Sequence, residues 1–207
     1  IIAMMLLAGC AAPRTQTPTA IYDFGLQRLA ASSAADPYSQ PRLSASLLVI
    51  ATSPVWLDSL AIQYRLAYQD LAQSYAYANN RWAAAPQILL TQRIKDRLAA
   101  VSNDGVVSAN DGVRADYTLR LELEEFTQIF DTTAQSRAVV RLRASLIERS
   151  TRILLAQRSF NVEQAAPTAN AAGAVHALTD ASDKLIGILI DWLSTELPGE
   201  RRTRHFE

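Results

Sequence analysis

The chain of 207 residues contains 20 basic and 20 acidic residues, so its formal net charge is zero. This balance gives no electrostatic reason to expect a nucleic acid or a strongly acidic partner. A single cysteine excludes an intramolecular disulfide, and the stability of the fold must therefore come from packing.

The N-terminal apolar run ends at that cysteine, Cys10. The run is far shorter than the ~20 residues that a membrane-spanning helix needs. Its ending, Leu7-Ala8-Gly9-Cys10, has the small residues of a secretory cleavage site and resembles the lipobox of bacterial lipoproteins. The resemblance implies that residues 1–9 are the remnant of a signal peptide that starts upstream, and that Cys10 carries the lipid. The alternative is a buried structural thiol, but no periodic segment follows that could bury it.

The segment after Cys10 is rich in proline and threonine, which predicts a flexible tether over residues 10–20. We expect one folded domain over residues 21–199 and a polar tail over residues 200–207. The domain starts with a short apolar and polar alternation at residues 21–25, and residues 30–41 predict a loop.

The first half of the domain predicts strands followed by a helix. Two β-rich segments lie at residues 43–50 and 62–69, and a short third one at 75–78 leads into Asn79-Asn80-Arg81-Trp82. A proline at position 86 can begin a helix without losing a hydrogen bond. The helix covers about residues 86–101, because one apolar stripe recurs at helical spacing through Leu90, Ile94, Leu98 and Val101.

The second half predicts a three-stranded meander and a long helix. Residues 117–124 alternate strictly, and a shift of phase at Phe126 indicates a bulge. Residues 140–146 and about 153–162 supply two further strands, joined by a turn near residues 150–152. The last helix covers about residues 171–197, with an apolar stripe through Val175, Leu178, Ser182, Leu185, Leu189 and Trp192.

This order of elements predicts the α+β (or α/β) class. We expect a single two-layer domain in which a mixed, mostly antiparallel sheet carries the two main helices.

Three segments resemble a known family in the expected order. They are "SYAYANNRWAAAPQILLTQRIKDRL" at 74–98, "ADYTLRLELEEFTQIFDTTAQSRAVVRLRASL" at 115–146 and "LTDASDKLIGILIDWL" at 178–193. Together with the lipobox they are similar to the ABC-type transport auxiliary lipoproteins, which include the outer-membrane lipoprotein of the paraquat-inducible (Pqi) transport system. The specificity lies in the co-occurrence of these segments, since none has catalytic content.

The resemblance implies a periplasmic domain that is lipid-anchored at the outer membrane. It would serve an ABC transporter of the mammalian-cell-entry (MCE) type, which moves phospholipid or other hydrophobic molecules across the Gram-negative envelope. Its partner would be the periplasmic MCE-domain subunit, and self-association is a further hypothesis. Ala11, in place of the aspartate common in inner-membrane lipoproteins, favours outer-membrane sorting. The alternative function is an envelope scaffold or assembly lipoprotein unrelated to transport, whose patterning would look similar.

The sequence favours a non-enzymatic protein without a metal or another cofactor. It contains no Gly-x-Ser-x-Gly elbow, phosphate loop, HExxH or GxGxxG motif. His176 lies beside an apolar stripe and His205 lies in the polar tail, and neither has ligand-forming partners at a suitable spacing. A carboxylate pair assembled from distant segments stays open.

The segment Asn80-Arg81-Trp82 has two interpretations. In the favoured one, Trp82 packs in the core while Arg81 and Asn80 bind local backbone groups. In the other, Arg81 and Trp82 form a docking surface for a partner, because tryptophan and arginine are enriched at binding hot spots. Four nearby tyrosines also have two interpretations: Tyr64, Tyr68, Tyr75 and Tyr77. They could line a lipid-accepting groove, or they could pack beneath a helix while their hydroxyl groups reach polar partners, which is the interpretation that we favour.

Overall fold

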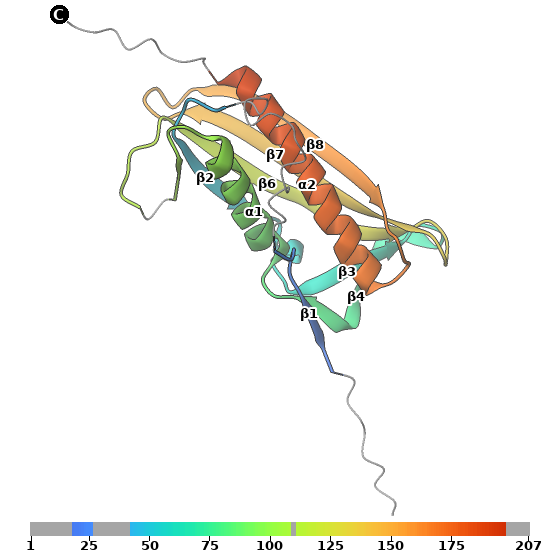
Figure 1. Ribbon diagram of the computed structural model, residues 1–207. Coiled ribbons are helices and arrows are strands. Elements are labelled where there is room, and N and C mark those ends of the chain that lie inside the picture. Colours follow the sequence, from blue (N-terminus) through green and yellow to red (C-terminus); the bar gives the residue numbers. More distant parts are fainter. Residues whose placement is uncertain (1–17, 27–41, 109–110, 198–207) are drawn as a thin grey trace, which may run out of the picture.

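The computed structural model describes residues 18–26, 42–108 and 111–197. They form a mixed eight-stranded sheet with two helices on one of its faces (Figure 1). The predicted α+β class is therefore confirmed.

The elements follow the chain in the order β1 (Ala20–Tyr22), β2 (Leu47–Thr52), the short 3-10 turn η1 (Val55–Leu57), β3 (Ala61–Leu66), β4 (Asp70–Trp82), α1 (Pro86–Val101), β5 (Val106–Val107), β6 (Tyr117–Phe130), β7 (Ser136–Glu148), β8 (Leu154–Ala165) and α2 (Ala171–Glu196). Both predicted helices are confirmed. The sequence predicts them well because each has a clear apolar stripe and a clear start. Pro86 opens α1, and the Asn170 side chain caps α2 by accepting a hydrogen bond from the Gly173 amide.

Strand β6 organises the sheet. On one side it pairs with β7 over its whole length, and β7 pairs with β8, so the predicted antiparallel meander is confirmed. The predicted bulge is also present, between Leu123 and Glu125. On its other side β6 runs parallel to β2 through residues 117–122 and parallel to β3 through residues 128–130. These parallel pairings, and those of β1 with β4 and β2 with β5, join segments that local patterning could not connect.

The first half of the domain departs most from the sequence prediction. Strand β2 begins at Leu47 instead of residue 43, because Leu43 forms only an isolated bridge with Ser102. The short segment predicted at residues 75–78 is part of the 13-residue strand β4. Its register against β3 shifts twice, and these irregularities interrupt the period of two that would have revealed its length.

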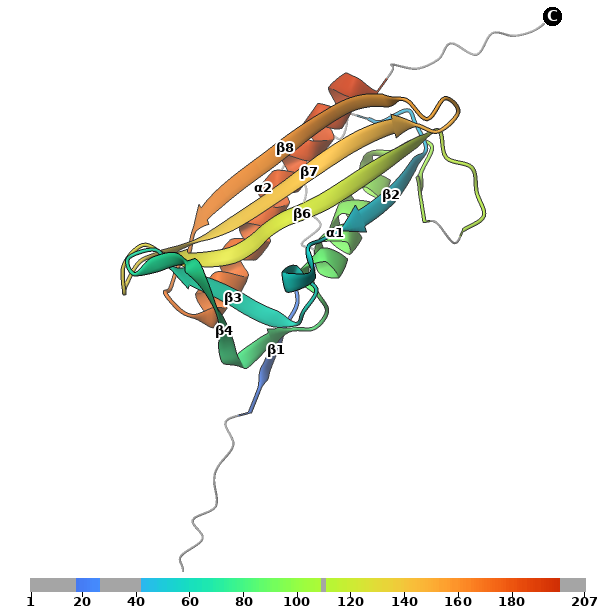
Figure 2. The same ribbon diagram turned by 180° about the vertical axis from the view of Figure 1, so that it is seen from behind.

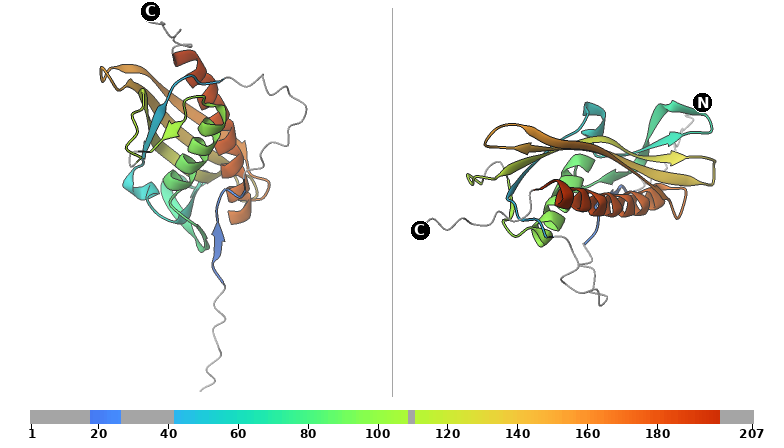
Figure 3. Two further views of the ribbon diagram at one scale, coloured as in Figure 1. Left: turned by 60° about the vertical axis from the view of Figure 1, so that its left-hand side comes forward. Right: turned by 90° about the horizontal axis from the view of Figure 1, so that it is seen from above.

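The core lies between the sheet and the two helices, which cover the same face (Figure 3). All the stripe residues predicted for α1 and α2 are buried there. Strand residues such as Leu119, Leu121 and Leu142 point into this core from the sheet. Their neighbours Arg120, Glu122 and Arg143 lie on the opposite face, which no helix among the described residues covers (Figure 2).

An ion pair joins the two helices to the segment after β1. Arg93 of α1 donates from Nε and Nη2 to the two carboxylate oxygens of Asp183 of α2, each at 2.6 Å. Its Nη1 donates to the carbonyl oxygen of Phe24 at 3.1 Å. The Arg93 side chain is only 10% exposed. Its bidentate contact with Asp183 therefore joins the two helices, and its hydrogen bond to Phe24 holds the N-terminal segment against α1.

Candidate docking surface

The structure separates the two residues of the predicted docking motif. Trp82 is 1% exposed, and its ring meets Phe24 and Phe126 edge-on at centroid distances of 5.8 and 5.7 Å. The docking hypothesis is therefore corrected for Trp82, because these aromatic rings enclose it in the core. The favoured packing interpretation describes it instead.

Arg81 occupies the opposite side of the same strand. Successive side chains of a strand alternate between faces, so a buried Trp82 directs Arg81 outward. Its guanidinium has no hydrogen bond or ion pair to any described residue, so it does not bind local backbone groups of the described part as the packing interpretation expected. For Arg81, docking stays a prediction.

Beside Arg81 lies an exposed tryptophan that sequence reasoning missed. Arg81 pairs with Ala61, and the Trp82 amide donates to the carbonyl oxygen of Leu60 at 2.8 Å, which brings the end of β4 against the start of β3. The turn η1 precedes this point and carries Trp56, which is 60% exposed. The available signal was the apolar triplet Val55-Trp56-Leu57 directly after Pro54, where a loop would normally be polar.

The open face around this point is polar and ion-paired. Arg143 of β7 contacts the carboxylates of Glu122 and Glu124 across the strand pair. The side chains of Arg143 and Glu122 are 44% and 48% exposed, so this ion-paired surface is hydrated.

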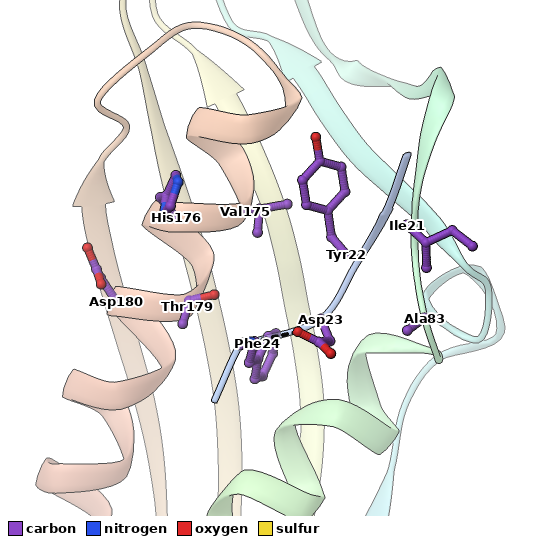
Figure 4. Close-up of a pocket in the computed structure, with 10 residues that line it drawn as sticks. Ile21, Tyr22, Asp23, Phe24, Ala83, Val175, His176, Thr179 and Asp180 are labelled. Carbon is purple, nitrogen blue, oxygen red and sulfur yellow. Dashed lines mark hydrogen bonds between the residues drawn. The ribbon is translucent and has the colours of Figure 1, made fainter. Parts of the chain in front are cut away.

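The helix-covered side contains an open groove of ≈ 310 Å³ between β1 and α2 (Figure 4). Apolar groups from β1, the segment after it and α2 line the groove, including Tyr22, Phe24 and Val175. His176 lies at the rim with an exposed side chain, as expected from the sequence, and Asp23 accepts a hydrogen bond from the Gly25 amide at 2.7 Å. The volume is at the small end of the range for ligand pockets.

The tyrosine cluster on β3 and β4 is anchored by a buried polar network. Tyr77 donates to Oε1 of Gln128 at 2.7 Å, and Nε2 of that fully buried glutamine donates to Oγ of Ser136 at 2.8 Å. Burial, with a smaller contribution from neighbouring Tyr64, raises the pKa of Tyr77 to about 12. The expected hydroxyl partner is thus confirmed for Tyr77, whereas Tyr68 is exposed in the turn between the strands.

Three further expectations concern anchoring and metal binding. Cys10 and His205 lie outside the described residues, so lipid attachment at Cys10 stays a prediction. Within residues 18–26, 42–108 and 111–197, no group of three or more histidine, cysteine or acidic side chains is arranged to hold a metal ion. In the same part of the chain, neither helix has the length and apolar character needed to cross a bilayer.

Solved structures share this fold at low sequence identity. Protein XCC0632 from Xanthomonas campestris, assigned to the family DUF330, superposes with a TM-score of 0.67 and 21% identity, over 76% of this chain and 88% of that protein. The hypothetical protein CT253 from Chlamydia trachomatis gives a TM-score of 0.51 and 8% identity, over 76% of this chain and 100% of that one. Identities this low establish similarity of fold alone.

The sequence comparison is more specific. The family described as "ABC-type transport auxiliary lipoprotein component" matches residues 28–187, a span that reaches from before β2 into α2. Among curated proteins, none matches the sequence.

Proposed function

Because this chain belongs to the family of ABC-type transport auxiliary lipoprotein components, we propose that it is the lipid-anchored docking subunit of an MCE-type ABC transporter. As a lipoprotein component it works in the cell envelope. The finer proposal is that Cys10 holds it at the periplasmic face of the outer membrane, where it receives the transporter's periplasmic MCE-domain subunit. The transported molecule would be phospholipid or another hydrophobic compound.

The observation that carries this proposal is the family match over residues 28–187. It covers most of the sheet and both helices, so it concerns the folded domain and not only the lipobox-like ending at Cys10.

The shape of the domain supports docking over cargo storage. Two helices seal one face of the sheet around a continuous apolar core, and the groove between β1 and α2 is small and open. A container for hydrophobic cargo needs an enclosed apolar cavity. We therefore infer that the domain binds a protein partner with its surface, without chemistry of its own.

The anchor is tested by Cys10→Ser in cells that export the protein. We expect the substituted chain to lack acyl groups and to move from the outer-membrane fraction of a density gradient to the soluble periplasmic fraction, because one or more acyl chains supply the membrane affinity. The unsubstituted chain, fractionated in parallel, is the control. An unacylated chain that stays with the outer membrane would contradict this part of the proposal.

The transporter role is tested by crosslinking in living cells. A photo-reactive amino acid at Arg81, on the open face, should capture the MCE-domain subunit, and the same probe at Ile188, on the outer side of α2, should not. Identification of the captured protein decides between two functions. Capture of peptidoglycan-associated or assembly proteins in its place would favour the envelope-scaffold alternative.

A further inference from the structure

Only one of the three tryptophans of the chain lies on the surface. Trp82 and Trp192 are buried in the core, whereas Trp56 is 60% exposed. Its neighbour Val55 is 88% exposed. An exposed tryptophan beside an exposed aliphatic side chain is the kind of apolar group that another protein can cover.

The fold holds Trp56 outward in a fixed position. Leu57, the last residue of η1, is 1% exposed and anchors the turn in the core. The amide of Leu57 donates to the Pro54 carbonyl at 2.9 Å, and Nε2 of Gln63 donates to the Trp56 carbonyl at 2.6 Å. Because the backbone is held on both sides, burying Trp56 within the domain would require breaking this turn.

Arg81 adds an unpaired charge to the same surface. It lies opposite Ala61, on the same face of β3 as Gln63, and it forms no hydrogen bond or ion pair within the described residues. Asp58 follows η1 and is exposed, but it forms no ion pair with Arg81. We call Val55, Trp56 and Arg81 the Trp56 patch.

The patch lies on the open side of the sheet, within a polar surrounding. The η1 turn connects the end of β2 to the start of β3 and faces the viewer between these strands in Figure 2. Thr52, just before the turn, pairs with Glu122, which belongs to the ion-paired surface around Arg143. An apolar centre with tryptophan and arginine, bordered by polar groups, is the anatomy of a protein–protein interface.

We propose that the Trp56 patch is the surface that binds the periplasmic MCE-domain subunit. That subunit would offer an apolar recess to Trp56 and a carboxylate to Arg81. The inference rests on the proposed function and adds to it the residues that make the contact. The charge pattern favours a protein over an anionic lipid surface, because the exposed carboxylates of Asp58 and Glu122 beside the patch would be repelled by lipid phosphates.

The exposed indole allows a direct test by acrylamide quenching of fluorescence. The Cys10→Ser chain is mixed with the purified MCE-domain subunit, and its fluorescence is recorded. The fluorescence of a second mixture, which contains a Cys10→Ser, Trp56→Phe chain, is subtracted to remove the signal of all other tryptophans. We expect Trp56 to be quenched in the free chain and shielded in the mixture. Vesicles of phosphatidylethanolamine and phosphatidylglycerol, and a concentration series of the chain alone, are measured in the same way.

Affinities of variants test the energetic role. We expect Trp56→Ala to weaken binding of the subunit at least about 30-fold, which is the loss seen at interface hot spots, and Arg81→Glu to weaken it as well. Ile188→Ala is the control, since it removes an exposed apolar side chain from the outer side of α2 and should leave binding unchanged. Each variant should unfold at the same temperature as the wild-type chain, which would show that its fold is intact.

The outcomes separate this inference from the proposed function. If the subunit binds the wild-type and Trp56→Ala chains equally, the inference is wrong while the proposed function stands. If the subunit does not bind the chain at all, both are wrong. Shielding of Trp56 by vesicles alone, or by a second copy of the chain alone, would likewise overturn the assignment of the patch to the MCE-domain subunit.

Discussion

The covered and the open face of the sheet come from the same strands but differ in what they can tolerate. Along β6, Leu119 and Leu121 are buried under the helices, while Arg120 and Glu122 alternate with them toward water. The covered face depends on close packing, and the open face depends on which exposed groups lack a partner within the domain. Stability and binding should therefore be separable by substitution.

Two tryptophans show this contrast most clearly. Trp82 fills the core against Phe24 and Phe126, whereas Trp56 projects from a turn on the open side. The residue type is the same and only its placement differs. The indole on the open face is available to contact a partner, whereas the indole on the covered face stabilises the fold by packing.

The largest expected contrast is between the alanine variants of these two tryptophans. Trp82→Ala should lower the free energy of unfolding by ~3–5 kcal/mol, because it leaves a large cavity in the core. Trp56→Ala should change it by no more than ~0.5 kcal/mol, as for most surface substitutions. Urea unfolding of both variants measures the difference. Equal losses would refute the division between the two faces.

Two arginines give a smaller contrast. Arg93→Ala should cost ~2–3 kcal/mol, because it removes charge-assisted hydrogen bonds to Asp183 and Phe24 from a nearly buried site. Arg143→Ala, which breaks the ion pairs with Glu122 and Glu124 on the open face, should cost less than ~1 kcal/mol. Urea unfolding at low and high salt is the measurement. The Arg143 effect should largely disappear at ~1 M salt, where exposed charges are screened, while most of the Arg93 effect should remain.

Two glycines of α2 provide a matched pair within the covering helix. A Cβ at Gly173 would lie 1.9 Å from the carbonyl oxygen of Thr168, so Gly173→Ala should cost ~1–3 kcal/mol through forced backbone movement. A Cβ at Gly187 meets no atom within 4 Å, so Gly187→Ala should stabilise the helix by about 0.5–1 kcal/mol. Opposite shifts of the melting temperature are expected. Similar shifts in one direction would contradict the close contact at Gly173.

The smallest effect concerns Tyr77 and depends on pH. Its pKa is raised from 10.0 to about 12, so the folded state keeps the proton that the unfolded state loses. The resulting stabilisation is complete below pH 10 and is lost as the pH rises toward 12. Tyr77→Phe should cost ~1 kcal/mol at neutral pH, through its lost hydrogen bond to Gln128, and should flatten the fall in stability across pH 10–12. Tyr68→Phe, in the exposed turn, is the control. An unchanged slope for Tyr77→Phe would show that another group causes the fall.

The predictable parts of the fold share strong local signals. Pro86 and four apolar residues predict helix α1, and the change of phase at Phe126 predicts the bulge in β6. Strand β4 was underestimated because its register against β3 shifts twice. For the candidate site, Arg81 was named from the sequence but Trp56 was not, since exposure of an apolar residue depends on the surroundings that the fold provides.

The sequence by itself determined the two helices, the meander, the two faces of its strands, and the lipobox-like ending at Cys10. These follow from periodicity and residue chemistry within short segments. Only the tertiary structure decided that β2 and β3 run parallel to β6, that Trp82 is enclosed while Trp56 is displayed, and that Arg81 is left without a partner among the described residues. The physical reason is that burial and pairing arise between segments far apart in the chain, so no local pattern records which neighbour each side chain will meet.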